Sequence, residues 1–253
     1  MHRTVLAPNA SPLTGDGTRT YLVGRARVAV IDPGSDDPDH LTAITEAIGD
    51  GVLVAVLVTH GHPDHLSGAG ALAERREARV LRLADGSLRD GTGVGTDAGR
   101  LVAVATPGHT SDHVAFHWPA ERAVFCGDLM LGGEDTALVA PPEGRLGPYL
   151  ASLERIRELG PDVIYPAHGP AFTQPTQAID RYVRHRELRL QQVLDALAAG
   201  AQDYDSLRAA VYGHDIEPEL ERAARAALKA YLEYLQGQGR VRRFGRGWQL
   251  KER

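Results

Sequence analysis

The segment at residues 59–65, THGHPDH, concentrates side chains that bind divalent metal ions. It carries histidine at positions 60, 62 and 65 and aspartate at position 64. Imidazole nitrogens and carboxylate oxygens are both good ligands for zinc. The apolar run GVLVAVLVT, residues 51–59, leads directly into this segment and is typical of a strand covered on both faces. The pattern predicts that His60, His62, Asp64 and His65 belong to a metal site at a strand end.

Three more side chains of the same kind follow apolar runs. His109 follows LVAVATPG, Asp128 follows AVFCG and His168 follows DVIYPA. If these strands share one sheet with roughly aligned ends, the side chains converge on one edge, where rigid scaffolds carry catalytic groups. Five histidines and two aspartates are too many for one tetrahedral ion, and they suit two ions with one shared carboxylate. A lone histidine would usually be surface or core filler, but the joint pattern predicts a metal site.

The N-terminal two thirds of the chain alternates short apolar runs with helical patterns. This alternation favours a layered α/β architecture built on a sheet. The runs at 113–118 and 123–128 are separated only by the turn PAER and are expected to pair as neighbours. Strands are further expected at 20–24, 27–32, 52–59, 101–106 and 162–167, and helices at 40–49, 65–78 and 148–160.

The pattern changes after Pro175. Three helical segments are expected at 176–200, 204–213 and 217–239, followed by two short strands, RVRRF and GWQLKE. Three helices and a hairpin form a winged-helix-like unit. The boundary falls near residues 170–176, so we expect two domains, a catalytic domain at 1–173 and a winged-helix-like domain at 174–253.

The overall composition is that of an ordinary globular protein of 253 residues, with 43% apolar residues and a net charge of −5. This charge argues against general binding of polyanions, although the part from Gln174 onward has 14 Lys/Arg against 11 Asp/Glu. The single cysteine, Cys126, cannot form a disulfide within the chain and fits a reducing compartment. We find no signal peptide and no apolar run of ~20 residues. A cytoplasmic protein without a membrane span is expected.

Several motifs occur in order between residues ~18 and 173. They are VIDPG (30–34), THGHPDH (59–65), TPGHT (106–110), GD (127–128) and PAHG (166–169). In these motifs the chain resembles the metallo-β-lactamase superfamily of hydrolases. The resemblance implies a four-layer αββα sandwich with a binuclear site. It places His60, His62 and His109 on the first metal and Asp64, His65 and His168 on the second, with Asp128 bridging them.

The C-terminal part is similar to the small winged-helix domain of one subgroup of this superfamily. The segments RHRELRLQQVLDAL, SLRAAVYG and AALKAYLEYLQGQGRV carry that similarity. The subgroup includes endonucleases of single-stranded RNA and thioesterases that act on carrier proteins. Arg19 is one departure, because relatives tend to carry asparagine there.

Two bridged cations make hydroxide available near neutral pH, and one of them can polarise the attacked oxygen. Asp64 is the predicted catalytic residue, because it could orient the nucleophile or accept a proton. Zinc is the expected ion, and a site of histidine and carboxylate also tolerates manganese or iron.

Two further side chains are candidates for binding substrate. His113 follows His109 by four residues and could face substrate, orient another group or begin a strand. Tyr149 could reach the site from the Gly/Pro-rich segment 129–150, which is expected to wall the pocket, or it could pack at a helix start. Cys126 is expected in the core.

The sequence leaves three functions open. The first is hydrolysis of a small thioester or related ester, as in hydroxyacylglutathione hydrolases. The second is cleavage of single-stranded RNA, since the tail RVRRFGRGWQLKER has six basic residues with Phe244 and Trp248 among them. We favour packing of both aromatic residues in the hairpin core. The third is a winged-helix regulator with a non-catalytic metal domain, which the intact ligand set disfavours. The helix at 217–236 could also form a homodimer face.

Overall fold

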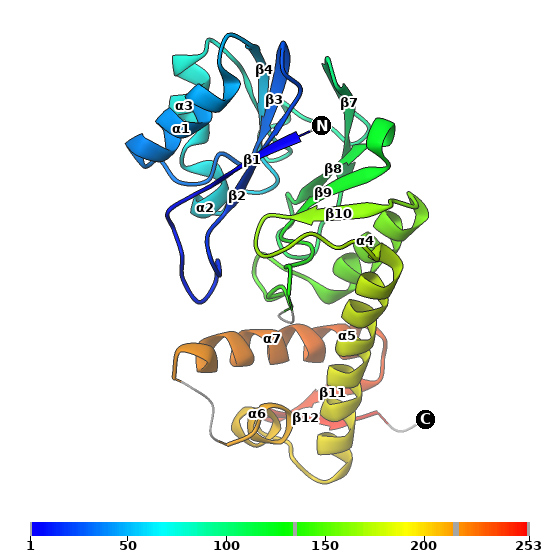
Figure 1. The fold of residues 1–253 in the computed structure, drawn as a ribbon. Helices are drawn as coiled ribbons and strands as arrows, with labels where there is room; N and C mark the ends of the chain where they lie inside the picture. The colour runs from blue at the N-terminus through cyan, green and yellow to red at the C-terminus, as the bar shows by residue number, and fades with distance from the viewer. Residues whose placement is uncertain (1, 134–135, 215–217, 252–253) are drawn as a thin grey trace.

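The computed structural model describes residues 2–133, 136–214 and 218–251 (Figure 1). Two five-stranded sheets pack face to face, with helices on their outer faces. The core between the sheets includes Ile31 and Leu57 from the first sheet and Phe116 and Phe125 from the second. These side chains come from the apolar runs that the sequence marks as strands. The structure therefore has the layered α/β architecture that was predicted.

The first sheet has the order β1-β2-β3-β4-β5. Strands β1, β2 and β3 are antiparallel neighbours, while β3, β4 and β5 run parallel. The strands expected at 20–24 and 27–32 pair as an antiparallel hairpin, and the C-terminal end of β4 leads into His60. The strands are β1 (His2–Leu6), β2 (Arg19–Val23), β3 (Arg27–Ile31), β4 (Val52–Leu57) and β5 (Val80–Leu81).

The second sheet has the order β10-β9-β8-β7-β6. Strand β8 is antiparallel to both β7 and β9, and β10 is parallel to β9, so β7, β9 and β10 run in one direction. Their C-terminal ends lead to His109, Asp128 and His168. Strand β4, which leads to His60, lies in the other sheet, so the condition that one sheet carries all of these strands does not hold. The strands are β6 (Gly93–Thr96), β7 (Gly99–Ala105), β8 (Val114–Trp118), β9 (Ala123–Gly127) and β10 (Val163–Pro166).

The helix expected at 65–78 is divided in two. Gly68 lies between the parts, and a Cβ atom there would come within 2.6 Å of the Ser35 carbonyl oxygen. Helix α1 begins where the Asp37 side chain accepts hydrogen bonds from the amides of Asp39 and His40. The helices of this part are α1 (Pro38–Ile48), α2 (Pro63–Leu66), α3 (Ala69–Arg75), the short 3₁₀ helix η1 (Pro119–Glu121) and α4 (Leu146–Glu158).

The C-terminal part consists of three helices and a hairpin in the predicted order. Figure 1 shows α5 extending from the sheets to the region where α6, α7 and the hairpin lie. The expected helix start at residue 217 lies outside the described residues. The elements are α5 (Pro175–Ala198), α6 (Tyr204–Tyr212), α7 (Pro218–Gly237), β11 (Val241–Phe244) and β12 (Gly247–Leu250).

One hydrophobic core joins the C-terminal helices to the second sheet. It runs from Leu129 and Tyr149, beside the sheet, to Leu228 on α7 and Trp248 on β12. The apolar side of α7 is thus buried within the chain, and the domain boundary at residue 173 stays a prediction. Among the described residues, none of the helices has the length and apolarity that a membrane span requires.

Candidate metal centre

The predicted ligands gather in two groups where the C-terminal ends of strands from both sheets meet. Loops after β4, β7, β9 and β10 supply them. In each group, the ligand atoms lie within 4.8 Å of one another. The first group is His60, His62, His109 and Asp128, and the second is Asp64, His65 and His168.

The first group brings three imidazole nitrogens together. Nδ1 of His62 lies 2.9 Å from Nε2 of His60 and 3.1 Å from Nε2 of His109. Oδ2 of Asp128 lies 3.7 Å from the same His109 nitrogen. Two nitrogen ligands of one tetrahedral zinc ion lie ~3.4 Å apart, given zinc–nitrogen distances of about 2.0–2.1 Å. The spacing in the first group is close to what one ion requires.

The second group has similar spacing. Oδ2 of Asp64 lies 3.4 Å from Nε2 of His65 and 3.3 Å from Nε2 of His168. Oδ1 of Asp128 lies 3.4 Å and 3.3 Å from the same two nitrogens. The two oxygens of Asp128 therefore face different groups, as a carboxylate shared by two ions would.

Among the residues that the structure describes, three atoms of this cluster are buried without a hydrogen-bond partner: Nε2 of His65, Nε2 of His168 and Oδ1 of Asp128. Buried polar atoms are nearly always paired, because an unpaired one costs free energy. A cation between two nitrogen lone pairs and a carboxylate oxygen would satisfy all three. The residues present thus fit a divalent metal ion.

Comparison with known proteins agrees with this geometry. The sequence profile of the Metallo-beta-lactamase superfamily matches residues 13–87 and 80–168. The chain belongs to the metallo-β-lactamase superfamily. It is 31% identical to the lactamase-like protein adaB of Aspergillus niger over 243 residues, which cover 87% of this chain and 75% of that protein.

Solved structures share the fold. The metallo-beta-lactamase family protein TTHA1429 from Thermus thermophilus superposes with a TM-score of 0.81 at 23% identity, covering 99% of this chain and 98% of that one. TTHA1623, solved in a di-iron-bound form, gives a TM-score of 0.56 at 25% identity, covering 72% of this chain and 97% of that one. The first likeness extends over the C-terminal helices as well.

In this superfamily member, Asp32 orients His65 of the second ligand group through the ring nitrogen that faces away from the candidate metal position. Nδ1 of the buried His65 donates to Oδ2 of Asp32 over 2.9 Å, which leaves Nε2 free to face a metal. The amide and hydroxyl of Thr59 donate to Asp32 over 2.8 and 2.7 Å. The sequence patterns gave Asp32 no role, although it directly follows strand β3 in the motif VIDPG, next to the strand that leads to His60.

Two members of the first ligand group, His62 and His109, depend instead on the connection between β9 and α4, whereas Nδ1 of His60 lies 3.1 Å from Oγ1 of Thr59. Nδ1 of His109 donates to the Leu138 carbonyl over 2.7 Å, and Nε2 of His62 lies 2.9 Å from Oε2 of Glu143. The buried Arg186 of α5 donates to the Ala137 carbonyl. Of the segment 129–150 that was predicted to wall the pocket, residues 134 and 135 lie outside the described residues.

The two predicted substrate-binding residues lie behind the site. His113 is fully buried, accepts a hydrogen bond from the Asp128 amide over 3.1 Å, and lies 2.8 Å from Oγ1 of Thr106. It orients the Asp128 loop and has no surface for substrate. Tyr149 is 0% exposed and donates to the Leu129 carbonyl over 2.7 Å. Its prediction as a substrate contact is wrong, because α4 turns this side chain into the core.

The two groups differ in protonation. Burial lowers the pKa of His60 and of His109 and keeps both imidazoles neutral. Burial also disfavours the charged form of His65 and His168, but neighbouring carboxylates outweigh it and raise both pKa values. For His65 the opposing carboxylates are Asp128 and Asp32. A metal entering the second group must therefore displace protons, whereas His60 and His109 of the first group offer free lone pairs.

Proposed function

We propose that the protein is a hydrolase of small thioesters or related esters that uses two divalent metal ions, with zinc as the expected ion. The observation that carries this proposal is the position of Asp128, whose two oxygens face two separate ligand groups. When bound, two such ions supply hydroxide near neutral pH and polarise the attacked carbonyl. Everything else in the reaction depends on how the side chains of this chain orient substrate and water.

Asp64 serves this chemistry as a charged orienting group. Burial opposes its ionisation, but the imidazoles of His168 and His65, 3.3 and 3.4 Å from its Oδ2, outweigh burial and lower its pKa. A carboxylate with a lowered pKa is a weak proton acceptor near neutral pH. Of the two roles predicted for Asp64, orienting the nucleophile is the one that this ionisation favours.

The identity of the metal follows from the donor set. Imidazole and carboxylate ligands suit zinc, and they also suit iron and manganese. The di-iron form of TTHA1623 supports iron as the alternative for this chain. Zinc remains the proposed ion.

The mouth of the site favours a small substrate over RNA. A hollow of about 180 Å³ lies beside His62 and is lined by the acidic residues Asp112 and Glu143. Negative side chains at this opening disfavour the close approach of a phosphodiester backbone. A thioester carbonyl carries no such charge.

Cleavage of single-stranded RNA is the second candidate. We infer a winged-helix unit from three helices followed by a hairpin. Phe244 is 57% exposed on this hairpin, beside the exposed Arg242 and Arg246. Cations and one aromatic ring could hold a single strand there. Trp248 is only 1% exposed, so it is not a second stacking platform. A purely regulatory role is disfavoured, because both ligand groups are complete.

A panel of substrates tests the proposal. The metal-loaded protein should be offered acyl-glutathione, an acyl-carrier thioester, a β-lactam and single-stranded RNA. Thioester hydrolysis is expected, and a variant with His60→Ala and His62→Ala should lose metal and hydrolysis together. The matched control is His117→Gln, since His117 lies outside both ligand groups. Cleavage of RNA without thioester hydrolysis would reverse the ranking of the two candidates.

A further inference from the structure

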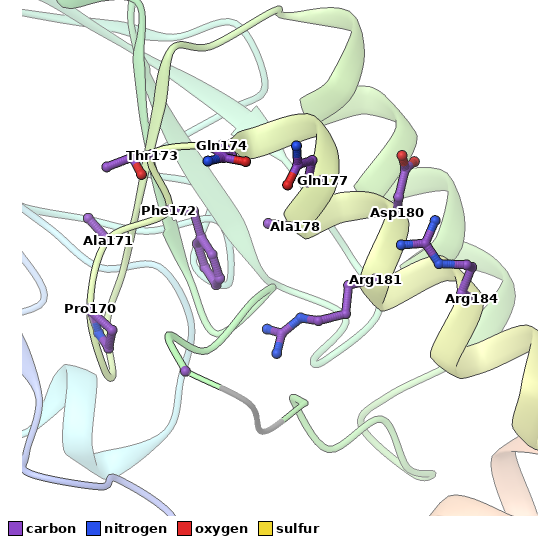
Figure 2. A pocket seen from close by; sticks show the side chains of 11 residues that line it. Pro170, Ala171, Phe172, Thr173, Gln174, Gln177, Ala178, Asp180, Arg181 and Arg184 are labelled. Carbon is purple, nitrogen blue, oxygen red and sulfur yellow. The ribbon is translucent and has the colours of Figure 1, made fainter.

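A cavity of about 660 Å³ opens at the N-terminal end of α5 (Figure 2). One wall is the segment after the ligand His168, including Pro170 and Phe172, and the other is the start of α5, including Gln177, Arg181 and Arg184. Figure 2 shows the Arg181 side chain extending from α5 toward the side on which Phe172 lies. The cavity is separate from the small hollow beside His62.

Within the described part of the chain, the arginine side chains that line the cavity have no acidic partner. Nη2 of Arg181 is buried and has no hydrogen-bond partner among the described residues. The Arg181 guanidinium lies 5.1 Å from the centre of the Tyr182 ring, a cation–π distance that holds it in place. Arg184 lies one helical turn further on and has no ion-pair partner in the described part of the chain.

The acid in the described lining does not neutralise these cations. Oδ1 of Asp180 lies 2.8 Å from Nη2 of Arg157, which is outside the cavity. A buried guanidinium nitrogen without a partner costs free energy, and an anion that accepts hydrogen bonds from it removes that cost. The cavity therefore suits an anionic group.

The cavity wall begins close to the second ligand group. Pro170 follows His168 by two residues, so their Cα atoms lie at most ~7 Å apart. The amide of Gly132 donates to the His168 carbonyl over 2.7 Å, which brings the loop after Asp128 to the same place. The wall of the cavity is therefore continuous in the backbone with the segment that carries His168.

We propose that Arg181 and Arg184 form an anion-binding subsite for a phosphate or carboxylate group on the thiol portion of the thioester substrate. The proposal rests on the thioester hydrolysis proposed above. Guanidinium groups pair with both anions through two parallel hydrogen bonds, so these two sources must be separated by experiment. A solvated helix surface does not explain the arrangement, because the unpaired nitrogen of Arg181 is buried.

The test uses thioether analogues that cannot be hydrolysed, so binding is measured apart from activity. S-methyl-coenzyme A carries phosphates, S-methylglutathione carries carboxylates, and S-methyl-N-acetylcysteamine is neutral. Calorimetric titration of the metal-loaded protein is expected to show at least one anionic analogue binding about tenfold more tightly than the neutral one. The preferred analogue identifies the anion.

Substitutions of the two arginines test whether they cause the preference for anionic analogues. The double variant Arg181→Gln and Arg184→Gln should lose about tenfold in affinity for the preferred anionic analogue and keep its affinity for the neutral one. Arg181→Lys should retain part of the preference, because the charge remains. The control is Arg222→Gln, an exposed arginine on α7, which should change neither.

Two results would overturn the subsite: an unchanged preference in the double variant, or an equal loss for the neutral analogue. Cleavage of single-stranded RNA that depends on the same two arginines would overturn it as well. If the protein binds anionic thioethers through these arginines but hydrolyses no thioester, the subsite stands and the proposed function fails.

Discussion

The two ligand groups of the metal centre are held by different parts of the molecule. The second group is fixed by Asp32, which directly follows strand β3 and accepts hydrogen bonds from the amide and hydroxyl of Thr59, just after β4. The first group is fixed by Leu138 and Glu143 in a connecting segment. Arg186 of the C-terminal helix α5 holds that segment. The loops at the sheet edge therefore position the side chains of the second group, whereas the C-terminal helices help to position those of the first.

The largest effect is expected where the groups meet. Asp128→Ala removes both oxygens that face the groups, so it should weaken metal binding at both and reduce hydrolysis at least ~100-fold. Metal analysis of the purified variant and its turnover measure this. A variant that retains two ions and normal turnover would show that the groups are independent.

Asp32→Ala should weaken metal binding at the second group and leave metal binding at the first group almost unchanged. It removes the acceptor of the His65 Nδ1–H bond, so the affinity of the second group should fall by about 10–100-fold while the first stays near wild type. Stepwise titration with zinc, followed by calorimetry, resolves the two steps. Equal weakening of both steps would contradict the assignment of Asp32 to one group.

The pH dependence of zinc affinity should also differ between the two groups. The raised pKa of His168 stabilises the metal-free fold at low pH, and this contribution is lost as the pH rises through that pKa. Zinc must displace protons from His168 and His65, so its affinity for the second group should rise with pH below their raised pKa values, by about tenfold per pH unit for each proton displaced. The gain in melting temperature on adding zinc should grow as the pH rises. A gain that shrinks with rising pH would contradict the raised pKa.

The smallest effect on metal affinity is expected from Arg186→Met. This change leaves the Ala137 carbonyl and the Tyr231 hydroxyl without their donor. It should cost about 2 kcal/mol of unfolding free energy and weaken only the first group, by roughly threefold. Denaturant unfolding and zinc titration measure the two quantities. Weakening of the second group instead would break the link between α5 and the first.

The sequence predicts which histidine and aspartate side chains gather at the candidate site, because their signals are local. His60, His109, Asp128 and His168 each follow an apolar run by a few residues, and a strand end can be recognised from such a run alone. The three C-terminal helices and the hairpin were predicted for the same reason. Their periodicity and turn residues lie within each segment.

What the sequence does not show depends on contacts between distant segments. Asp32 meets His65 across 33 positions, and His109 meets the Leu138 carbonyl across 29. The division of the ligands between two sheets, and the turning of Tyr149 into the core, also follow from packing. Strands β1, β5 and β6 escaped prediction because they are short or incompletely buried.

The most direct test is a zinc titration of protein stripped of metal by a chelator, with bound zinc and thioester hydrolysis measured on the same samples. The account predicts no hydrolysis by the stripped protein, and hydrolysis that rises with bound metal to two ions per chain. Hydrolysis that is undiminished without metal, or a chain that retains no zinc at saturation, would contradict it.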